Sequence, residues 1–186
     1  MSTPAKTFEC SALPERYAFA LCRIEPENNV ATILEAFALS TAMPLIFVGN
    51  WNNSAFSREL KQRYAKHAHL HLLDPIYDVG ILRTLRGNAA IYVHGHSAGG
   101  TNPSLVEMMH FGLPILAFDC IFNRYTTEDC AIYFKDIDSL RLALNTLNFS
   151  DSSQIGSNMR RIALERYTWD TIGRAYFELF DSEFAL

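Results

Sequence analysis

The sequence predicts an α/β domain in which a parallel sheet of about six strands carries helices on both faces. Six short apolar runs are spread along the 186 residues. They are hydrophobic throughout rather than alternating, which is typical of strands buried on both faces. Amphipathic stretches with helical spacing separate them, and repeated strand–helix units form parallel sheets. The pattern therefore predicts one Rossmann-like domain, with a helical C-terminus after the last strand.

The expected strands are 17–22, 44–49, 70–73, 89–93, 114–118 and 131–134. Helical spacing follows the first two strands, where Val30, Ile33, Leu34 and Phe37, then Phe56, Leu60 and Tyr64, recur every three or four residues. Three helices are expected at the end, near 138–147, 152–165 and 168–183. The last has Thr168 as its N-cap and a buried face of Trp169, Ile172, Tyr176 and Leu179. Residues 1–14 are predicted to be a polar lead-in, and 15–186 the folded domain.

Composition excludes several classes of protein. The chain is 49% hydrophobic, too apolar for a disordered protein, and its four cysteines are too few for a disulfide scaffold. Sixteen Lys and Arg against twenty Asp and Glu give a net charge of −4, which does not favour nucleic-acid binding. No apolar run reaches the roughly 18 residues of a membrane span, and a signal-peptide core is absent. We expect a cytoplasmic protein without a bound cofactor.

Ligands of such folds bind beyond the carboxyl ends of the strands. In this chain those positions are 23–29, 49–53, 74–77, 94–102 and 119–127.

A phosphate cradle is predicted where a glycine-rich loop leads into a helix at 103–111. Asn102 is a favourable N-cap and Pro103 suits the first helical position. The amides of Ser104 and Leu105, with the Ser104 hydroxyl, would then bind phosphate at the positive end of the helix. Glu107 lies on the same helical face, either to hydrogen-bond a ribose hydroxyl or as a solvated side chain.

Two other chemistries, serine hydrolysis and metal binding, have weaker support in the sequence. The run Gly95-His96-Ser97-Ala98-Gly99 matches the G-x-S-x-G of serine hydrolases, but no histidine follows His110 and the helix starts late. Two groups of histidines, 94 and 96 and then 67, 69 and 71, lack further ligands at typical spacing, so no metal site is predicted. Asp136 and Asp138 suit a helix cap rather than a metal-binding D-x-D.

These segments together resemble the C-terminal, nucleotide-sugar-binding domain of GT-B glycosyltransferases, within the large retaining family numbered four. The resemblance covers about 15–182. It is carried by R-I-E-P-E-N-N at 23–29, the strand ending in Val-Gly at 48–49, G-G-T-N-P-S-L-V-E at 99–107, F-G-L-P-I at 111–115 and R-Y-T-W at 166–169. R-I-E-P-E-N-N and H-S-A-G-G-T-N-P-S also resemble a rhamnosyltransferase-like subgroup, which suggests a donor such as dTDP-rhamnose.

The resemblance implies roles for individual residues. Arg23 would bind the donor diphosphate and Glu107 the ribose, and these two are the candidate catalytic residues; the loop from Gly99 to Asn102 would face the sugar, and the backbone near Tyr77 the base. The candidate substrate-binding residues are Asn28, Gly49, Asn50, Asp74, Ile76, Tyr77, His96, Gly99, Gly100, Thr101, Asn102, Ser104 and Leu105. Trp51 either stacks on the ligand or packs on its neighbours.

Three positions depart from the family pattern. Asn28 replaces a lysine, Gly99 the first glutamate of E-x7-E, and Cys22 a glycine. The expected partners are a nucleotide-diphosphate sugar, a glycan or lipid-linked acceptor, and an acceptor-binding N-terminal domain or partner chain. Through that second half the protein could associate with the inner face of the membrane. The hypothesis is a metal-independent, retaining glycosyltransferase; the alternative is a non-catalytic nucleotide-sugar-binding module.

Overall fold

The computed structural model describes residues 13–147 and 149–184, and shows one sheet of six parallel strands in the order β3-β2-β1-β4-β5-β6. The strands are β1 (Ala18–Leu21), β2 (Leu45–Val48), β3 (Leu70–Leu73), β4 (Ile91–His94), β5 (Ile115–Phe118) and β6 (Ile132–Phe134). The central strand β1 pairs with β2 on one side and with β4 on the other. The predicted Rossmann-like α/β fold is confirmed. Residues 1–12 of the predicted lead-in lie outside the described residues.

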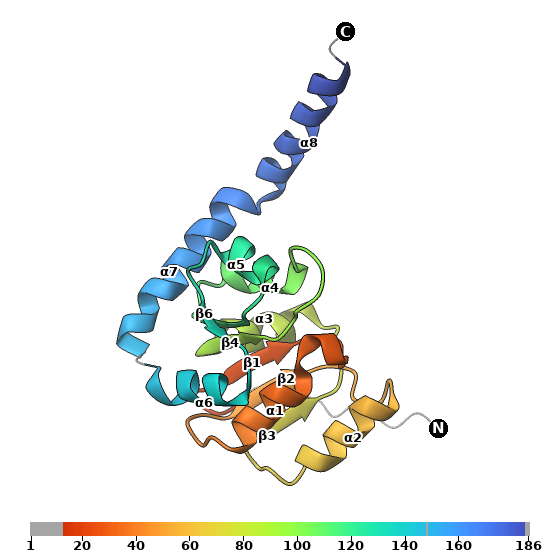
Figure 1. Cartoon of the computed structure of the whole chain (residues 1–186), viewed down its shortest axis with the longest axis vertical. Helices are drawn as coiled ribbons and strands as arrows, with labels where there is room; N and C mark the ends of the chain where they lie inside the picture. Colours follow the sequence, from red (N-terminus) through yellow and green to blue (C-terminus); the bar gives the residue numbers. More distant parts are fainter. Residues whose placement is uncertain (1–12, 148, 185–186) are drawn as a thin grey trace.

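Helices cover both faces of the sheet, as predicted (Figure 1). The elements are the 3-10 helix η2 (Pro26–Asn28), then α1 (Val30–Ala38), α2 (Ala55–Tyr64), α3 (Val79–Gly87), α4 (Pro103–His110), α5 (Ile121–Thr127), α6 (Ile137–Thr146), α7 (Phe149–Arg166) and α8 (Trp169–Phe184). Buried side chains of α1, α2 and α6 pack on one face of the sheet, and those of α3, α4 and α7 on the other.

The two cores follow from the alternation of side chains along each strand. In β1, Ala18 and Ala20 contribute to the core beneath α1, whereas Phe19 contributes to the core beneath α4. All three are buried, so β1 has no solvent-facing side at these positions. This explains why the strand reads as a continuous apolar run.

Three predicted helix caps are present. The Asn102 Oδ1 accepts the Ser104 N–H at 3.0 Å at the start of α4, and the Asp136 Oδ1 accepts the Ser139 N–H at 2.8 Å at the start of α6. The Thr168 Oγ1 accepts the N–H of Thr171 at 3.2 Å before α8. Caps depend on neighbouring residues alone, which is why the sequence reveals them.

The prediction of a buried face on the last helix is wrong. Trp169 is 89% exposed, and Tyr176 and Leu179 are each 63% exposed. Figure 1 shows the reason, since α8 continues from α7 away from the sheet instead of folding back on it. No helix within the described residues is long and apolar enough to cross a membrane.

Candidate functional site

A cleft of about 520 Å³ opens at the carboxyl edge of the sheet, where β1, β2 and β4 end. The strand order changes direction between β1 and β4, and such switch points are the usual ligand sites of open α/β sheets. The residues that line the cleft are Leu21, Cys22, Arg23, Ile24, Asn28, Val48, Gly49, Asn50, Asn53, Pro75, Ile76, Tyr77, His96, Asn102 and Ser104. Four of the five predicted segments therefore meet here, and 119–127 contributes no lining side chain.

Arg23 supplies the positive charge of the cleft. It is the only Lys or Arg among the described residues that line the cleft, and it lies two residues after the end of β1. Its guanidinium is exposed and forms no hydrogen bond or ion pair with any described residue. A planar guanidinium without an internal partner is well suited to hold two oxygens of an anionic ligand.

Asn28 does not project a charge into the cleft but fixes the ring of His96. Its Nδ2 donates to the carbonyl of Arg23 at 2.7 Å, and its Oδ1 lies 2.7 Å from the His96 Nδ1. Because a carbonyl can only accept, the amide orientation is determined, and Nδ1 of His96 must carry a proton to donate to Oδ1. Nε2 is therefore the ring nitrogen of His96 that is left for a ligand.

Two glycines bring the loops of the cleft together. A Cβ on Gly95 would lie 2.1 Å from the carbonyl oxygen of Asn28, and a Cβ on Gly49 would lie 2.9 Å from that of Cys22. The carbonyl of Gly95 also accepts from the Asn29 side chain at 2.8 Å. Only glycine allows this approach of the loops after β1, β2 and β4.

The expected free amides of Ser104 and Leu105 are not free. The Ser104 N–H and hydroxyl both donate to the Oδ1 of Asn102, and the Leu105 N–H donates to the Asn102 carbonyl at 3.1 Å. The N-cap that starts the helix thus occupies the amides assigned to phosphate. Leu105 is fully buried and does not line the cleft, whereas Ser104 and Asn102 do.

Unpaired amides lie instead in the loop before α4. The N–H groups of residues 98–102 donate no hydrogen bond to any part of the chain that the structure describes. Gly99 has a φ of +85°, a left-handed backbone that suits glycine, and an added Cβ at Gly99 or Gly100 would meet nothing within 4 Å. This loop borders the cleft, although Gly99, Gly100 and Thr101 are not among its lining residues.

Glu107 is held by Arg86, which no sequence motif singled out as a functional residue. The Arg86 Nη1 donates to the Glu107 Oε1 at 2.5 Å. The Arg86 side chain is 11% exposed and that of Glu107 is 50% exposed. Glu107 does not line the cleft but lies one helical turn after Ser104, which does. Its second carboxylate oxygen has no hydrogen-bond partner within the described residues.

The segment after β3 meets the cleft with only part of its predicted residues. Ile76 and Tyr77 line it, together with Pro75, which belongs to the expected segment 74–77 but was not among the candidate residues. Asp74 does not line it and forms an ion pair with Lys61 at 3.1 Å. Trp51 is fully buried, and its Nε1 donates to the carbonyl of Leu73 at 2.9 Å, so it packs rather than stacks on a ligand.

A histidine and a tyrosine are buried behind the cleft. The Tyr92 hydroxyl lies 3.3 Å from the His94 Nδ1, and the His94 Nε2 has no partner in the described chain. Burial lowers the pKa of His94 to about 3 and raises that of Tyr92. His94 is therefore neutral at physiological pH.

The hydrolase reading finds no support in the geometry. The Ser97 hydroxyl donates to the carbonyl of Glu27 at 2.8 Å, and none of its described partners is a histidine. The helix after it begins only at Pro103. Across residues 13–147 and 149–184, three or more metal-ligating side chains do not gather in any one place.

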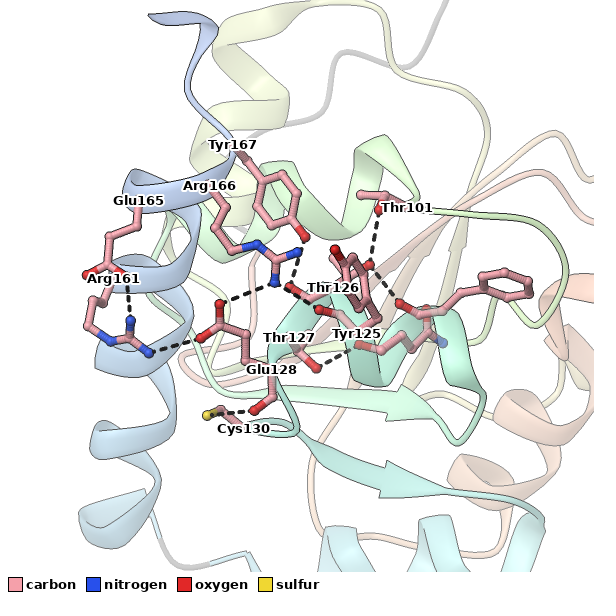
Figure 2. Close-up of polar contacts among 12 residues, drawn as sticks. Thr101, Tyr125, Thr126, Thr127, Glu128, Cys130, Arg161, Glu165, Arg166 and Tyr167 are labelled. Carbon is pink, nitrogen blue, oxygen red and sulfur yellow. Dashed lines mark hydrogen bonds and ion pairs between the residues drawn. The ribbon is translucent and has the colours of Figure 1, made fainter. Parts of the chain in front are cut away.

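A second polar network supports the loop after β4 from the side of α5 (Figure 2). The Asn123 Nδ2 donates to the carbonyl of His96 at 2.9 Å and to that of Phe118 at 2.8 Å. Farther along α5, the Thr126 Oγ1 lies 3.5 Å from the Thr101 Oγ1. The Asn123 bonds hold the start of the loop at His96, and Thr126 lies next to its later part at Thr101.

The same network attaches α7 to α5. The Glu128 carboxylate accepts from Arg161 at 3.4 Å and from Arg166 at 3.2 Å, and Figure 2 shows it between the two guanidinium groups. Arg166 also donates to the carbonyl of Tyr125, and the Tyr167 hydroxyl donates to that of Thr126. The R-Y-T-W segment at 166–169 thus anchors the C-terminal helices beside the loop before α4.

Comparison with known proteins gives one family and a consistent fold. Residues 8–145 match the family Glycosyl transferases group 1. Sucrose-phosphate synthase (tll1590) from Thermosynechococcus elongatus superposes with a TM-score of 0.80 at 20% identity, covering 93% of this chain and 47% of that one. Anabaena Alr3699/HepE in complex with UDP superposes with a TM-score of 0.77 at 18% identity, covering 89% of this chain and 48% of that one.

A third structure is similar over nearly its full length. The C-terminal domain of the glycosyl transferase group 1 family protein LpcC from Francisella tularensis gives a TM-score of 0.71 at 14% identity, covering 89% of this chain and 95% of that one. The chain spans about half the length of the first two structures. No curated protein matches it significantly in sequence.

Proposed function

Because this chain belongs to the group 1 glycosyl transferases, we propose that its cleft binds the nucleotide-diphosphate sugar of a metal-independent, retaining glycosyltransferase. The acceptor would be a glycan or a lipid-linked glycan at the cytoplasmic face of the membrane, bound by a second domain or partner chain. The HepE structure contains UDP, which supports a nucleotide diphosphate as ligand. The subgroup resemblance makes dTDP-rhamnose the first donor to test.

The proposal is carried by an unpaired cation inside the cleft and unpaired backbone amides in the loop that borders it, both at the switch point of the sheet. Within the described residues, Arg23 has no hydrogen-bond or ion-pair partner and the amides of residues 98–102 have no acceptor. Both would stabilise the negative charge that develops on the diphosphate as its bond to the sugar breaks. Glu107, with its second carboxylate oxygen unpaired, would accept from the ribose hydroxyls one helical turn farther on.

Calorimetric titration with UDP-glucose, GDP-mannose, dTDP-glucose and dTDP-rhamnose tests this proposal. Replacing Arg23 by Ala should weaken binding by about 1.5–3 kcal/mol, the value of a charge-assisted hydrogen bond. The matched control is Arg83→Ala on α3, since Arg83 is exposed and outside the cleft. If none of the four nucleotide sugars binds, the proposal is wrong.

The second candidate is a non-catalytic nucleotide-sugar-binding module. It is favoured by two neutral positions of the site, since Asn28 is turned toward His96 and Gly99 has no side chain to hold a sugar. Adding the acceptor-binding half and an acceptor distinguishes the two candidates: sugar transfer supports the enzyme, and binding without transfer supports the module.

A further inference from the structure

The cleft has a deficit of positive charge for a diphosphate. Of the lining residues that the structure describes, Arg23 is the only one with a charged side chain. The diphosphate of a nucleotide sugar carries two negative charges, so one guanidinium balances half of them. His96 is the one other lining side chain that can become a cation near neutral pH.

The contact with Asn28 decides how His96 can respond. With Nδ1 donating to the Asn28 Oδ1 at 2.7 Å, a neutral His96 has a lone pair on Nε2. A lone pair repels a phosphate oxygen, whereas a protonated Nε2 donates to it. The ring cannot exchange its two nitrogens without losing the bond to Asn28, whose amide is fixed by the carbonyl of Arg23. The carbonyl of His96 is itself held by Asn123.

We infer that His96 takes up a proton from solvent on Nε2 when a nucleotide-diphosphate sugar binds, and so becomes the second cation of the phosphate site. The inference rests on the proposed function and deepens it. Asn28 acts as a positioning residue for His96, because it orients the ring and leaves Nε2 to the ligand. The permanent charge of the family's lysine, which Asn28 replaces, would thus give way to a charge on His96 that appears only when the ligand binds.

The neighbouring titratable groups leave His96 as the source of this proton uptake. On its own segment, His94 is neutral, since burial lowers its pKa to about 3. Cys22, at the end of β1, has its pKa raised to about 12 by burial and stays a thiol. The remaining charged or titratable groups on the packed segments are Arg23, Glu25 and Glu27 before α1, and Asp119, Cys120, Arg124 and Tyr125 in or just before α5. None of these side chains is an imidazole, and a cysteine or a tyrosine carries no positive charge in any state.

Proton uptake is measured by calorimetry of the full chain in buffers of different ionisation enthalpy. The probes are UDP-glucose, GDP-mannose and dTDP-glucose, whose diester phosphates do not titrate between pH 6.5 and 8.5. We expect about 0.5–1 proton taken up per bound nucleotide sugar at pH 7.5, and an affinity that falls roughly tenfold from pH 6.5 to 8.5. His96→Gln, which keeps a neutral donor, should abolish the uptake, flatten the pH profile and bind about tenfold more weakly at pH 6.5.

The control is His67→Gln, because His67 precedes β3 at the opposite edge of the sheet, and this variant should match the wild type. Binding without proton uptake, or uptake that persists in His96→Gln, overturns the inference and leaves the proposed function intact. Absence of binding by the wild type overturns both.

Discussion

The pairing of Arg86 with Glu107 predicts an asymmetric response to mutation. The Arg86 side chain is 11% exposed and its Nε has no partner, whereas Glu107 is 50% exposed. Glu107→Ala would leave the buried Arg86 guanidinium without its ion-pair partner, so that it would have to be solvated by water or move out of the core. A hydrogen bond to a charged group contributes about 1.5–3 kcal/mol, and the exposure of Glu107 reduces this to an expected loss of about 1–2 kcal/mol.

Removing Arg86 should lower the free energy of unfolding by less than removing Glu107. Arg86→Met keeps most of the volume, removes an unsatisfied buried N–H and leaves a carboxylate that water can solvate, so we expect a loss of less than about 1 kcal/mol. The double variant should be scarcely less stable than Arg86→Met alone, because no guanidinium is left unpaired. The two sites are therefore non-additive by about 1 kcal/mol.

Urea unfolding followed by circular dichroism measures these free energies, with thermal midpoints as a second readout. For a domain of this size, 1 kcal/mol corresponds to a shift of about 2–4 °C. The control Asp74→Ala breaks the exposed pair with Lys61 and should cost less than about 1 kcal/mol. Equal destabilisation of the fold by Arg86→Met and Glu107→Ala, or additive effects of the two substitutions, would contradict this predicted asymmetry.

Two further predictions concern the base of the cleft. Gly95→Ala places a Cβ 2.1 Å from a backbone oxygen and should lower the free energy of unfolding by about 1–3 kcal/mol or more. In the control Gly100→Ala the new Cβ meets nothing within 4 Å and should change this free energy by less than about 0.5 kcal/mol. Equal urea midpoints for the two variants would contradict this prediction. Because burial lowers the pKa of His94 to about 3, the unfolded chain binds a proton below pH 6.5 that the folded chain does not, so this contribution to stability is complete above pH 6.5 and is lost as pH falls toward 3. Between pH 7 and pH 5 the wild type should lose about 2 kcal/mol more than His94→Leu in urea unfolding, and equal losses would show that His94 is not responsible.

Local patterns in the sequence were sufficient to predict the strands, the helix starts and the edge of the sheet where a ligand would bind. These features depend on neighbours along the chain: β1 reads as an apolar run because both of its faces are buried, and α4 begins at Asn102 because that side chain caps the helix locally. The segments 23–29 and 94–102 could be assigned to the cleft for the same reason, since parallel strands all end at one edge.

Which side chains meet depends on contacts between segments that lie far apart in the sequence. Asn28 and His96 are 68 residues apart, and Arg86 and Glu107 are 21 apart, so no local pattern reveals either contact. The cap at Asn102 also shows a competition that a pattern cannot resolve, because the amides suited to a phosphate already have an acceptor within the chain. An amphipathic stretch such as α8 indicates that one face is apolar, but not what covers it. What covers it depends on the direction in which α7 leads the chain, and that direction is set by long-range packing and by the arginines that hold Glu128.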